Sequence, residues 1–252
     1  MNCVPTNIYR NAVMAADAVV VTSKFKIEVR RNARSATFLP FLFNKFVYLP
    51  SQIDAMKIAL SYYRQTDVVA LARDLIGKYL FTLVDGQLAG GIITEAEAYN
   101  GVGDRASHSF GGRRTRRNEM MYHDGGVAYV YFCYGMHCMF NIVTNLENQP
   151  EAVLIRAIYP THGEELMLKR LGKSKMSPAL TNGPGKLTRA LGITMPMNGK
   201  PLDSDEIWLE DRHLQIPDAL VNITPRIGVD YAGPDSSLPY RFVTTYCPIG
   251  QE

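Results

Sequence analysis

The sequence predicts an α+β fold, in which short helices surround a largely antiparallel β-sheet. Segments rich in β-branched and aromatic residues recur along the chain, and stretches with helical spacing of apolar residues lie before and after them. The 252 residues are 46% hydrophobic, which is enough for a sizeable core in one domain or in two small ones. Because no internal repeat or low-complexity tract is present, we expect one domain with a tail.

The tail is the first part of the chain. Residues 1–50 contain seven lysines and arginines against only Asp17 and Glu28, and they have no clean helical or strand period. Organelle transit peptides have such a basic composition, but the arginine-spaced amphipathic helix is missing, and an upstream tail without a targeting role also explains the segment. We predict residues 1–55 to be an extension, disordered or targeting, and residues 56–252 to be the functional domain.

The domain is predicted to begin with a helix and a β-hairpin. The helix is indicated by apolar residues that recur at intervals of three and four positions: Val68, Leu71, Leu75, Ile76 and Tyr79. Thr66-Asp67, directly before them, can cap its N-terminus. Residues 81–84 and 88–98 then form two strands. Asp85-Gly86 joins them, since this dipeptide tolerates the positive φ values of a type I′ turn.

Three more strands and two more helices follow. The strands are predicted at residues 127–133, 140–144 and 153–158, which are rich in β-branched or aromatic residues. The helices are predicted at residues 164–171 and 186–191, and a turn over residues 182–185 comes immediately before the second.

Composition limits the compartment and the class of partner. No run of eighteen apolar residues is present, so we expect no membrane span, and four cysteines without C-x2-C pairs suggest a reducing, intracellular compartment. The net charge of +3 is mild, so any affinity for nucleic acid must come from clustered charge. One such cluster follows two glycines and suits phosphates, although a solvated surface run explains it equally well: Arg113, Arg114, Arg116 and Arg117.

Two carboxylates are predicted to share one face of the second strand. Alternation places Glu95, Glu97 and Tyr99 together on that face. An exposed edge is the simplest explanation, because burying an unpaired charge costs several kcal/mol, roughly. Tyr99 on the same face and His108 nearby favour instead a mixed polar and aromatic pocket.

Three tyrosines near the end of one strand and an arginine within another are also unusual. Tyr129, Tyr131 and Tyr134 run into a glycine turn, where exposed aromatics can stack on an extruded base or wedge between base pairs. Core aromatics at strand spacing are the ordinary explanation. Arg156 lies in an apolar strand and is expected to need a carboxylate, so its ordinary role is a salt bridge, for example to Glu95.

Two further motifs do not have their usual meaning. Gly183 to Leu187 resembles a phosphate loop, but that loop needs Ser or Thr where this chain has Leu187. The helix N-terminus at Gly185 and Lys186 can still accept one DNA phosphate, because its N–H groups are free. We expect no metal, because no common zinc spacing fits the nearby Cys133, His137 and Cys138.

Five segments carry a resemblance to a known family. They are Glu95 to Tyr99, His108 to Arg113, Tyr129 to Met136, Leu154 to Ala157 and Asn182 to Leu187. In this order they resemble the alkyladenine (3-methyladenine) DNA glycosylase family, over about residue 63 to the C-terminus. The resemblance implies a curved sheet and a protruding β-hairpin that intercalates into DNA. It also implies a base-excision repair enzyme that flips alkylated or deaminated purines and hydrolyses the N-glycosidic bond.

The same resemblance assigns roles to individual residues. Glu97 would be the general base, with Arg156 and the backbone carbonyl of Ile227 as further ligands of the attacking water. Tyr134 would fill the gap that the flipped base leaves in the duplex. His137 departs from a familiar form of the family, in which some members have another aromatic residue at this position.

The resemblance also assigns the base pocket and the partners. Tyr99 would stack on one side of the base and His108 and Tyr131 on the other, while Asn141 would exclude guanine through its exocyclic amine. The partner would be double-stranded DNA containing a damaged purine, bound by a monomer without a cofactor or a membrane. The expected location is the cytoplasm or nucleoid of a bacterium, or the nucleus or an organelle of a eukaryote.

The chemistry of these residues agrees with the resemblance. Cleavage builds oxocarbenium character at C1′, which a nearby carboxylate stabilises while it orients water. No lysine is placed as an evident Schiff-base nucleophile, which favours a monofunctional enzyme. Two alternatives stay open: a carbohydrate glycosidase that uses Glu95 and Glu97, ~7 Å apart on a strand, and a non-catalytic module that binds distorted DNA.

Overall fold

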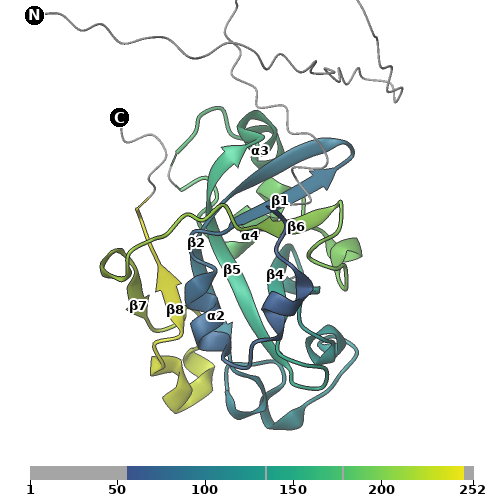
Figure 1. Cartoon of the computed structure of the whole chain (residues 1–252), viewed down its shortest axis with the longest axis vertical. Helices are drawn as coiled ribbons and strands as arrows, with labels where there is room; N and C mark the ends of the chain where they lie inside the picture. The colour runs from purple at the N-terminus through teal and green to yellow at the C-terminus, as the bar shows by residue number, and fades with distance from the viewer. Residues whose placement is uncertain (1–55, 134, 178, 247–252) are drawn as a thin grey trace, which may run out of the picture. The chain divides into compact units, whose positions relative to one another are not determined.

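The computed structural model describes residues 56–133, 135–177 and 179–246, so the predicted extension lies outside the described residues. The described residues form a curved, antiparallel sheet with helices around it, which confirms the predicted fold class (Figure 1). The strand order is β3-β4-β5-β2-β1-β6, and β8 pairs with both β2 and β7. Among the described residues, no helix is long and apolar enough to cross a membrane.

All the predicted strands and helices are present, and three short strands were not predicted. The strands are Tyr79–Val84 (β1), Gln87–Tyr99 (β2), Ala128–Cys133 (β3), His137–Thr144 (β4), Glu151–His162 (β5), Ile207–Glu210 (β6), Asn222–Thr224 (β7) and Arg241–Val243 (β8). The α-helices are Val68–Asp74 (α2), Glu164–Leu171 (α3) and Pro184–Leu191 (α4). Turns of 3-10 helix are Leu60–Arg64 (η1), Gly101–Gly103 (η2), Phe110–Gly112 (η3), Glu119–Tyr122 (η4), Met195–Met197 (η5), Asp218–Leu220 (η6) and Asp230–Ser237 (η7).

The first helix begins as predicted but ends earlier. A carboxylate oxygen of Asp67 accepts two hydrogen bonds from N–H groups of the first turn, at 3.0 and 2.9 Å. Tyr79 was predicted to continue the helix, and this is wrong, because α2 ends at Asp74 and Tyr79 begins β1. Gly77 makes the change of direction possible. Its φ is +98°, and a Cβ atom there would lie 2.9 Å from the carbonyl oxygen of Leu214.

Two hairpins form part of the sheet. Asp85 and Gly86 have φ values of 52° and 71°, which confirms the predicted turn between β1 and β2. Strands β3 and β4 pair up to Cys133 and His137, which are opposite each other. Tyr134 lies between these two residues but outside the described residues, so its insertion into DNA stays a prediction.

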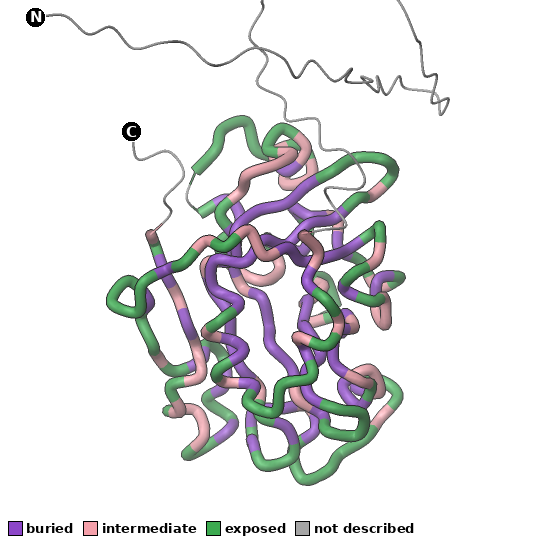
Figure 2. Tube along the Cα trace, viewed as in Figure 1, coloured by how far each residue is buried: buried purple, intermediate pink, exposed green. Residues whose placement is uncertain are grey.

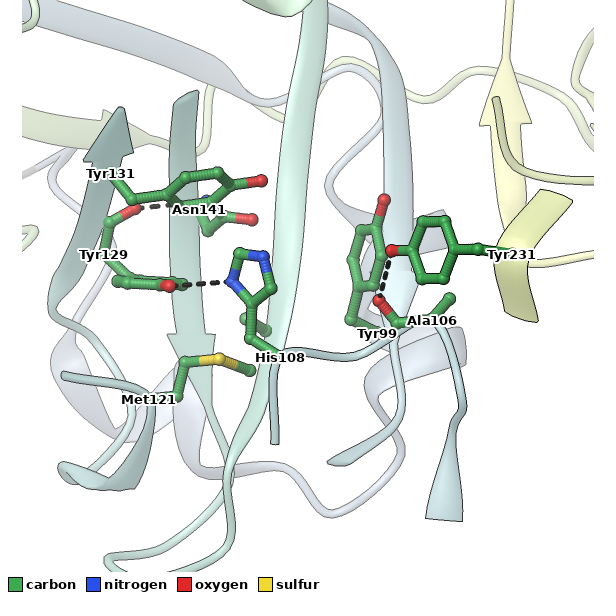
Figure 3. Close-up of a pocket in the computed structure, with 9 residues that line it drawn as sticks. Tyr99, Ala106, His108, Met121, Tyr129, Tyr131, Asn141 and Tyr231 are labelled. Atoms are coloured by element: carbon green, nitrogen blue, oxygen red, sulfur yellow. Dashed lines mark hydrogen bonds between the residues drawn. The ribbon is translucent and has the colours of Figure 1, made fainter. Parts of the chain in front are cut away.

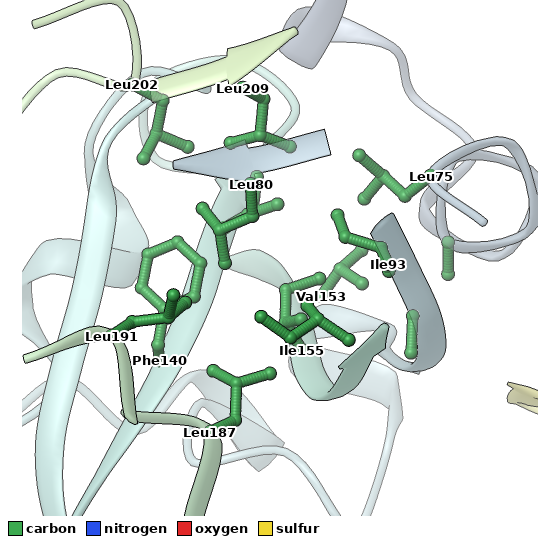
Figure 4. Packing of buried hydrophobic residues seen from close by; sticks show 14 of the residues in the cluster. Leu75, Leu80, Ile93, Phe140, Val153, Ile155, Leu187, Leu191, Leu202 and Leu209 are labelled. Carbon is green, nitrogen blue, oxygen red and sulfur yellow. The ribbon is translucent and has the colours of Figure 1, made fainter. Parts of the chain in front are cut away.

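One face of the sheet packs against α2 and α4. Leu80, Ile93 and Ile155 point from the sheet into this core, where they meet Leu75, which directly follows α2, and Leu187 of α4 (Figure 4). All five are no more than 3% exposed. In Figure 2 the tube is coloured as buried along much of β2 and β5. The helices therefore fix the sheet from one side and leave the opposite face for other contacts.

An irregularity in the β2–β5 pairing brings charged residues to that opposite face. The register skips Thr94 on β2 and Arg156 on β5. In a regular strand, core residues are two positions apart. Here two successive core residues of β2, Ile93 and Ala96, are three positions apart. The alternation changes phase here, and the residues that point away from the core afterwards are Glu95, Glu97 and Tyr99.

Candidate active site

Glu97 is the most deeply buried carboxylate of this face. Its exposed fraction is 0%, yet each of its oxygens has hydrogen-bond donors. Oε1 accepts from the backbone N–H of Ile227 at 2.8 Å, and Oε2 accepts from the hydroxyl of Tyr99 at 3.0 Å and from Nη1 of Arg156 at 3.3 Å. Burial raises the pKa of Glu97, although Arg156, Ile227 and Tyr99 act in the opposite direction. Such a carboxylate is suited to accept a proton near neutral pH.

Arg156 lies between two carboxylates. Its Nε donates to Oε1 of Glu95 at 2.8 Å, and the same nitrogen is 3.3 Å from Oε1 of Glu97. The predicted salt bridge to Glu95 is therefore present, together with a longer contact to Glu97. Arg241 of β8 also donates to Glu95, at 2.6 Å. The charges on this face are balanced, two carboxylates against two guanidinium groups.

A pocket opens beside Tyr99, whose hydroxyl donates to Glu97. It contains about 340 Å³ of empty space, part of which is open to solvent. The pocket brings together all four residues that were predicted to hold the base, which Figure 3 shows on its two sides: Tyr99, His108, Tyr131 and Asn141. They come from β2, β3, β4 and the loop after η2.

Hydrogen bonds within the pocket hold two of these side chains in place. Nδ1 of His108 lies 2.8 Å from the hydroxyl of Tyr129, and the amide nitrogen of Asn141 donates to the carbonyl of Tyr129 at 3.2 Å. Burial, with Arg117 and Arg113 nearby, lowers the pKa of His108 to about 4. The ring of His108 is consequently neutral at pH 7 and can stack without repelling a cationic base.

Several other pocket residues were not predicted. Tyr129, Met121, Ala106, Ala152 and Tyr231 also line it. Tyr129 belongs to the noted tyrosine segment, so its position on a strand was a usable signal. Tyr231 comes from η7, far along the chain, and its hydroxyl donates to the carbonyl of Ala106 at 3.1 Å. No local pattern in the sequence points to it.

A buried ion pair connects the C-terminal part of the chain to the pocket. Arg226 and Asp104 have side chains that are 0% and 2% exposed, and Nη2 of Arg226 donates to Oδ1 of Asp104 at 2.8 Å. Asp104 also accepts from the backbone N–H of Ala106, in the loop that leads to His108. The guanidinium of Arg226 lies 4.9 Å from the ring centroid of Tyr99. Arg226 thus supports both sides of the pocket.

The structure places the four clustered arginines in different surroundings. Arg114 is tied to the protein, because it forms an ion pair of 2.5 Å with Glu119 and donates to Asn148 at 3.0 Å. Arg117 donates to a backbone carbonyl at 3.0 Å. Arg113 and Arg116 are exposed. The predicted contacts of Arg113 and Arg114 with DNA phosphates stay predictions.

The N-terminus of α4 lies beside the β3–β4 hairpin. A Cβ atom on Gly185 would lie 3.0 Å from the ring of His137, so a larger residue there would displace this ring by a few tenths of an ångström. Lys186 is exposed, and its Nζ is 3.4 Å from the carbonyl of Ala179. The phosphate contact predicted for Gly185 and Lys186 is not tested by these distances. Among the described residues there is no group of three or more potential metal ligands.

Comparison with known proteins gives a consistent picture. A family described as methylpurine-DNA glycosylase matches residues 61–248. Proteins of Chlamydia felis and Bacillus thuringiensis, both provisionally named 3-methyladenine DNA glycosylase, are 45% and 44% identical to this chain over 184 and 196 residues. These alignments cover 73% and 74% of this chain and 93% and 95% of the two relatives. The chain therefore belongs to the methylpurine-DNA glycosylase family, and it is a DNA glycosylase of DNA repair.

Proposed function

We propose that this DNA glycosylase excises alkylated and deaminated purines from double-stranded DNA, as a monomer and without a cofactor. The substrates would be 3-methyladenine, 7-methylguanine, hypoxanthine and ethenoadenine or lesions of their class. The observation that carries the proposal is a buried carboxylate, Glu97, next to a pocket lined by aromatic side chains. The relatives' names, which refer to 3-methyladenine, agree with it.

In the proposed reaction, water attacks C1′ of the flipped nucleotide while Glu97 accepts its proton. The C1′–N9 bond breaks, and its electron pair leaves with the base. A base alkylated at N3 or N7 is cationic, so it departs as a neutral molecule without a proton donor, whereas a neutral lesion such as hypoxanthine departs as an anion and takes up a proton from solvent water. Arg156 and the backbone carbonyl of Ile227 would hold the water together with Glu97. The negative charge of Glu97 also stabilises the oxocarbenium character at C1′.

The pocket side chains would select the base. Tyr99 would stack on one side and His108 and Tyr131 on the other, with a cation–π contribution of about 0.5–2 kcal/mol for a cationic lesion on a tyrosine face. Asn141, whose amide nitrogen is already engaged, would oppose the exocyclic amine of guanine. Tyr134 would occupy the vacated position in the duplex.

Single-turnover excision on a panel of duplexes tests this function. Each duplex carries one lesion of the proposed class or an undamaged purine, and released base and strand integrity are measured separately. We expect release of the damaged base from an intact strand. Release of no damaged base would reject the substrate class, and immediate strand cleavage would reject the monofunctional mechanism.

The contacts of Glu95 disfavour a carbohydrate glycosidase. A retaining or inverting pair needs one carboxyl group that can donate a proton to the leaving group. Glu95 is 3% exposed, and two guanidinium groups donate to its Oε1. Its carboxylate is therefore occupied by two arginines and is not free to act on a sugar as acid or as nucleophile.

Arg113→Ala is expected to weaken binding of damaged and undamaged duplexes equally, because a phosphate contact carries no base information. The slope of log K against log salt should decrease by roughly one unit. The melting temperature should stay the same, since Arg113 is exposed. Binding titrations at several salt concentrations measure the slope.

Arg114→Ala is the matched comparison for Arg113→Ala. It should change the melting temperature only slightly, because the pair of Arg114 with Glu119 is exposed, and it should change the salt slope less than Arg113→Ala, because Arg114 is already engaged by Glu119 and Asn148. An unchanged salt slope for Arg113→Ala would assign Arg113 to the solvated surface.

A further inference from the structure

Glu95 has an unusual set of partners for a residue beside an active site. A single oxygen, Oε1, accepts from Nε of Arg156 at 2.8 Å and from Nε of Arg241 at 2.6 Å. The two arginines come from β5 and β8, which flank β2 on opposite sides. Arg241 is itself held by the hydroxyl oxygen of Thr224, to which its Nη1 donates at 2.9 Å. Glu95 is thus fixed from both sides.

Arg156 is shared unequally between the two carboxylates. Its distance to Glu95 is 2.8 Å, whereas both of its contacts with Glu97 are 3.3 Å. A guanidinium prefers two short, parallel bonds to one carboxylate, and that arrangement is the strongest one available to it. Here the nitrogen that such a bidentate pair with Glu97 would use is engaged by Glu95.

We propose that Glu95 is a positioning residue, which keeps Arg156 from closing as a bidentate partner onto Glu97. Without Glu95, the Nε and Nη1 groups of Arg156 would both shorten their contacts with Glu97. That pairing would stabilise the ionised carboxylate, make it a weaker base and occupy the side on which water has to bind. This inference rests on the proposed role of Glu97 as the base.

The sign of the pH effect follows from the groups that face Glu97. They are Tyr99 and Glu95 on β2, Arg156 on β5, Tyr131 on β3, and Arg226 with the N–H of Ile227 from the C-terminal segment. The charge of Glu95 raises the pKa of Glu97, and Arg156 lowers it. Loss of Glu95 therefore lowers the pKa of Glu97 for two reasons: it removes a negative charge, and it releases Arg156 toward Glu97. Loss of Arg241 removes a positive charge and acts in the opposite direction.

The test is the pH dependence of single-turnover excision, with the lesion that the wild type releases fastest. Glu95→Gln should reduce the maximal rate about 100-fold, the order of loss that a displaced catalytic group produces. Glu97 acts as a base in its ionised form, so the rate falls at acid pH where Glu97 becomes protonated. A lower pKa of Glu97 should therefore move this acid limb of the pH–rate profile to lower pH. Arg241→Gln should move the acid limb to higher pH.

Glu164→Gln serves as the control. Glu164 is exposed, and it lines, together with Glu95, a second pocket of the protein that is separate from the proposed base pocket. It should leave both rate and pH profile unchanged. A purely structural role of Glu95 predicts lower melting temperatures without opposite displacements of the acid limb.

The outcomes separate this inference from the proposed function. If Glu95→Gln leaves the acid limb in place while Glu97→Gln is inactive, the positioning role is rejected and the role of Glu97 stands. If Glu97→Gln keeps its activity, the proposed base itself is wrong. If Glu95→Gln does not fold, Glu95→Asp decides, because it keeps the charge and withdraws the carboxylate from Arg156. Displacement of the acid limb of its pH–rate profile to lower pH supports the proposal, and an unchanged limb overturns it.

Discussion

Replacing Glu97 with glutamine should reduce the single-turnover rate of base release by about 10³-fold, within the range attributed to a general base. Glutamine keeps the shape of the side chain, so the N–H of Ile227 can still donate to its carbonyl oxygen, while the amide nitrogen replaces the oxygen that accepts from Tyr99 and Arg156. The amide cannot take a proton from water and carries no negative charge toward C1′. Binding of the lesion-bearing duplex should persist, because the pocket side chains are untouched. Rates and equilibrium binding measured on one substrate separate the two effects.

The control and the contradictory outcome are equally specific. Glu206→Gln removes an exposed carboxylate that is paired with Lys200, away from the pocket, and should excise at the wild-type rate. If Glu97→Gln released the base within tenfold of the wild type, Glu97 would not be the base. If the variant lost lesion binding as well, its main role would be in the shape of the pocket.

Asp104→Asn is expected to produce the largest loss of stability. It leaves the guanidinium of Arg226 buried without its counter-charge, and breaking a buried pair in this way costs about 3–5 kcal/mol. For a domain of this size the melting temperature should fall by roughly 6–20 °C. Excision should fall as well, because Arg226 lies against the ring of Tyr99 and precedes Ile227. Thermal unfolding and excision of the same preparation measure both effects.

Asp218→Asn is the matched control for this variant. Asp218 also pairs with an arginine, Arg73 at 2.6 Å, but its side chain is 97% exposed, and exposed pairs contribute little. Its melting temperature should be nearly that of the wild type. An equally small change for Asp104→Asn would mean that water reaches Arg226 and that the pair is not a buried one.

Residues close together in the sequence were predictable, and contacts between distant segments were not. Alternation placed Glu95, Glu97 and Tyr99 on one face, and the strand pattern holds for that part of β2. The phase change before Glu95 could not be predicted, because it depends on pairing with β5. Tyr79 was misplaced because its helical spacing continues past Gly77, although the chain turns there.

The C-terminal part of the site was largely beyond sequence reasoning. Strands β7 and β8 have three residues each, which is too short for a recognisable alternation. Arg241 reaches Glu95 across 146 positions, and Arg226 reaches Asp104 across 122. Only the resemblance to a family pointed to Ile227, and it concerned the carbonyl of this residue rather than the N–H that contacts Glu97.

The separation between Glu97 and Ile227 in the sequence determines when the site can form during protein synthesis. The two residues are 130 positions apart, so at about 5–20 residues per second a ribosome needs roughly 6–26 s to pass from one codon to the other. During this interval the nascent chain contains Glu97, the proposed base, but lacks the N–H of Ile227 and the guanidinium of Arg226. On this proposal the site is complete only after Ile227 has been added, and a message that stops before Arg226 yields a protein without a complete site.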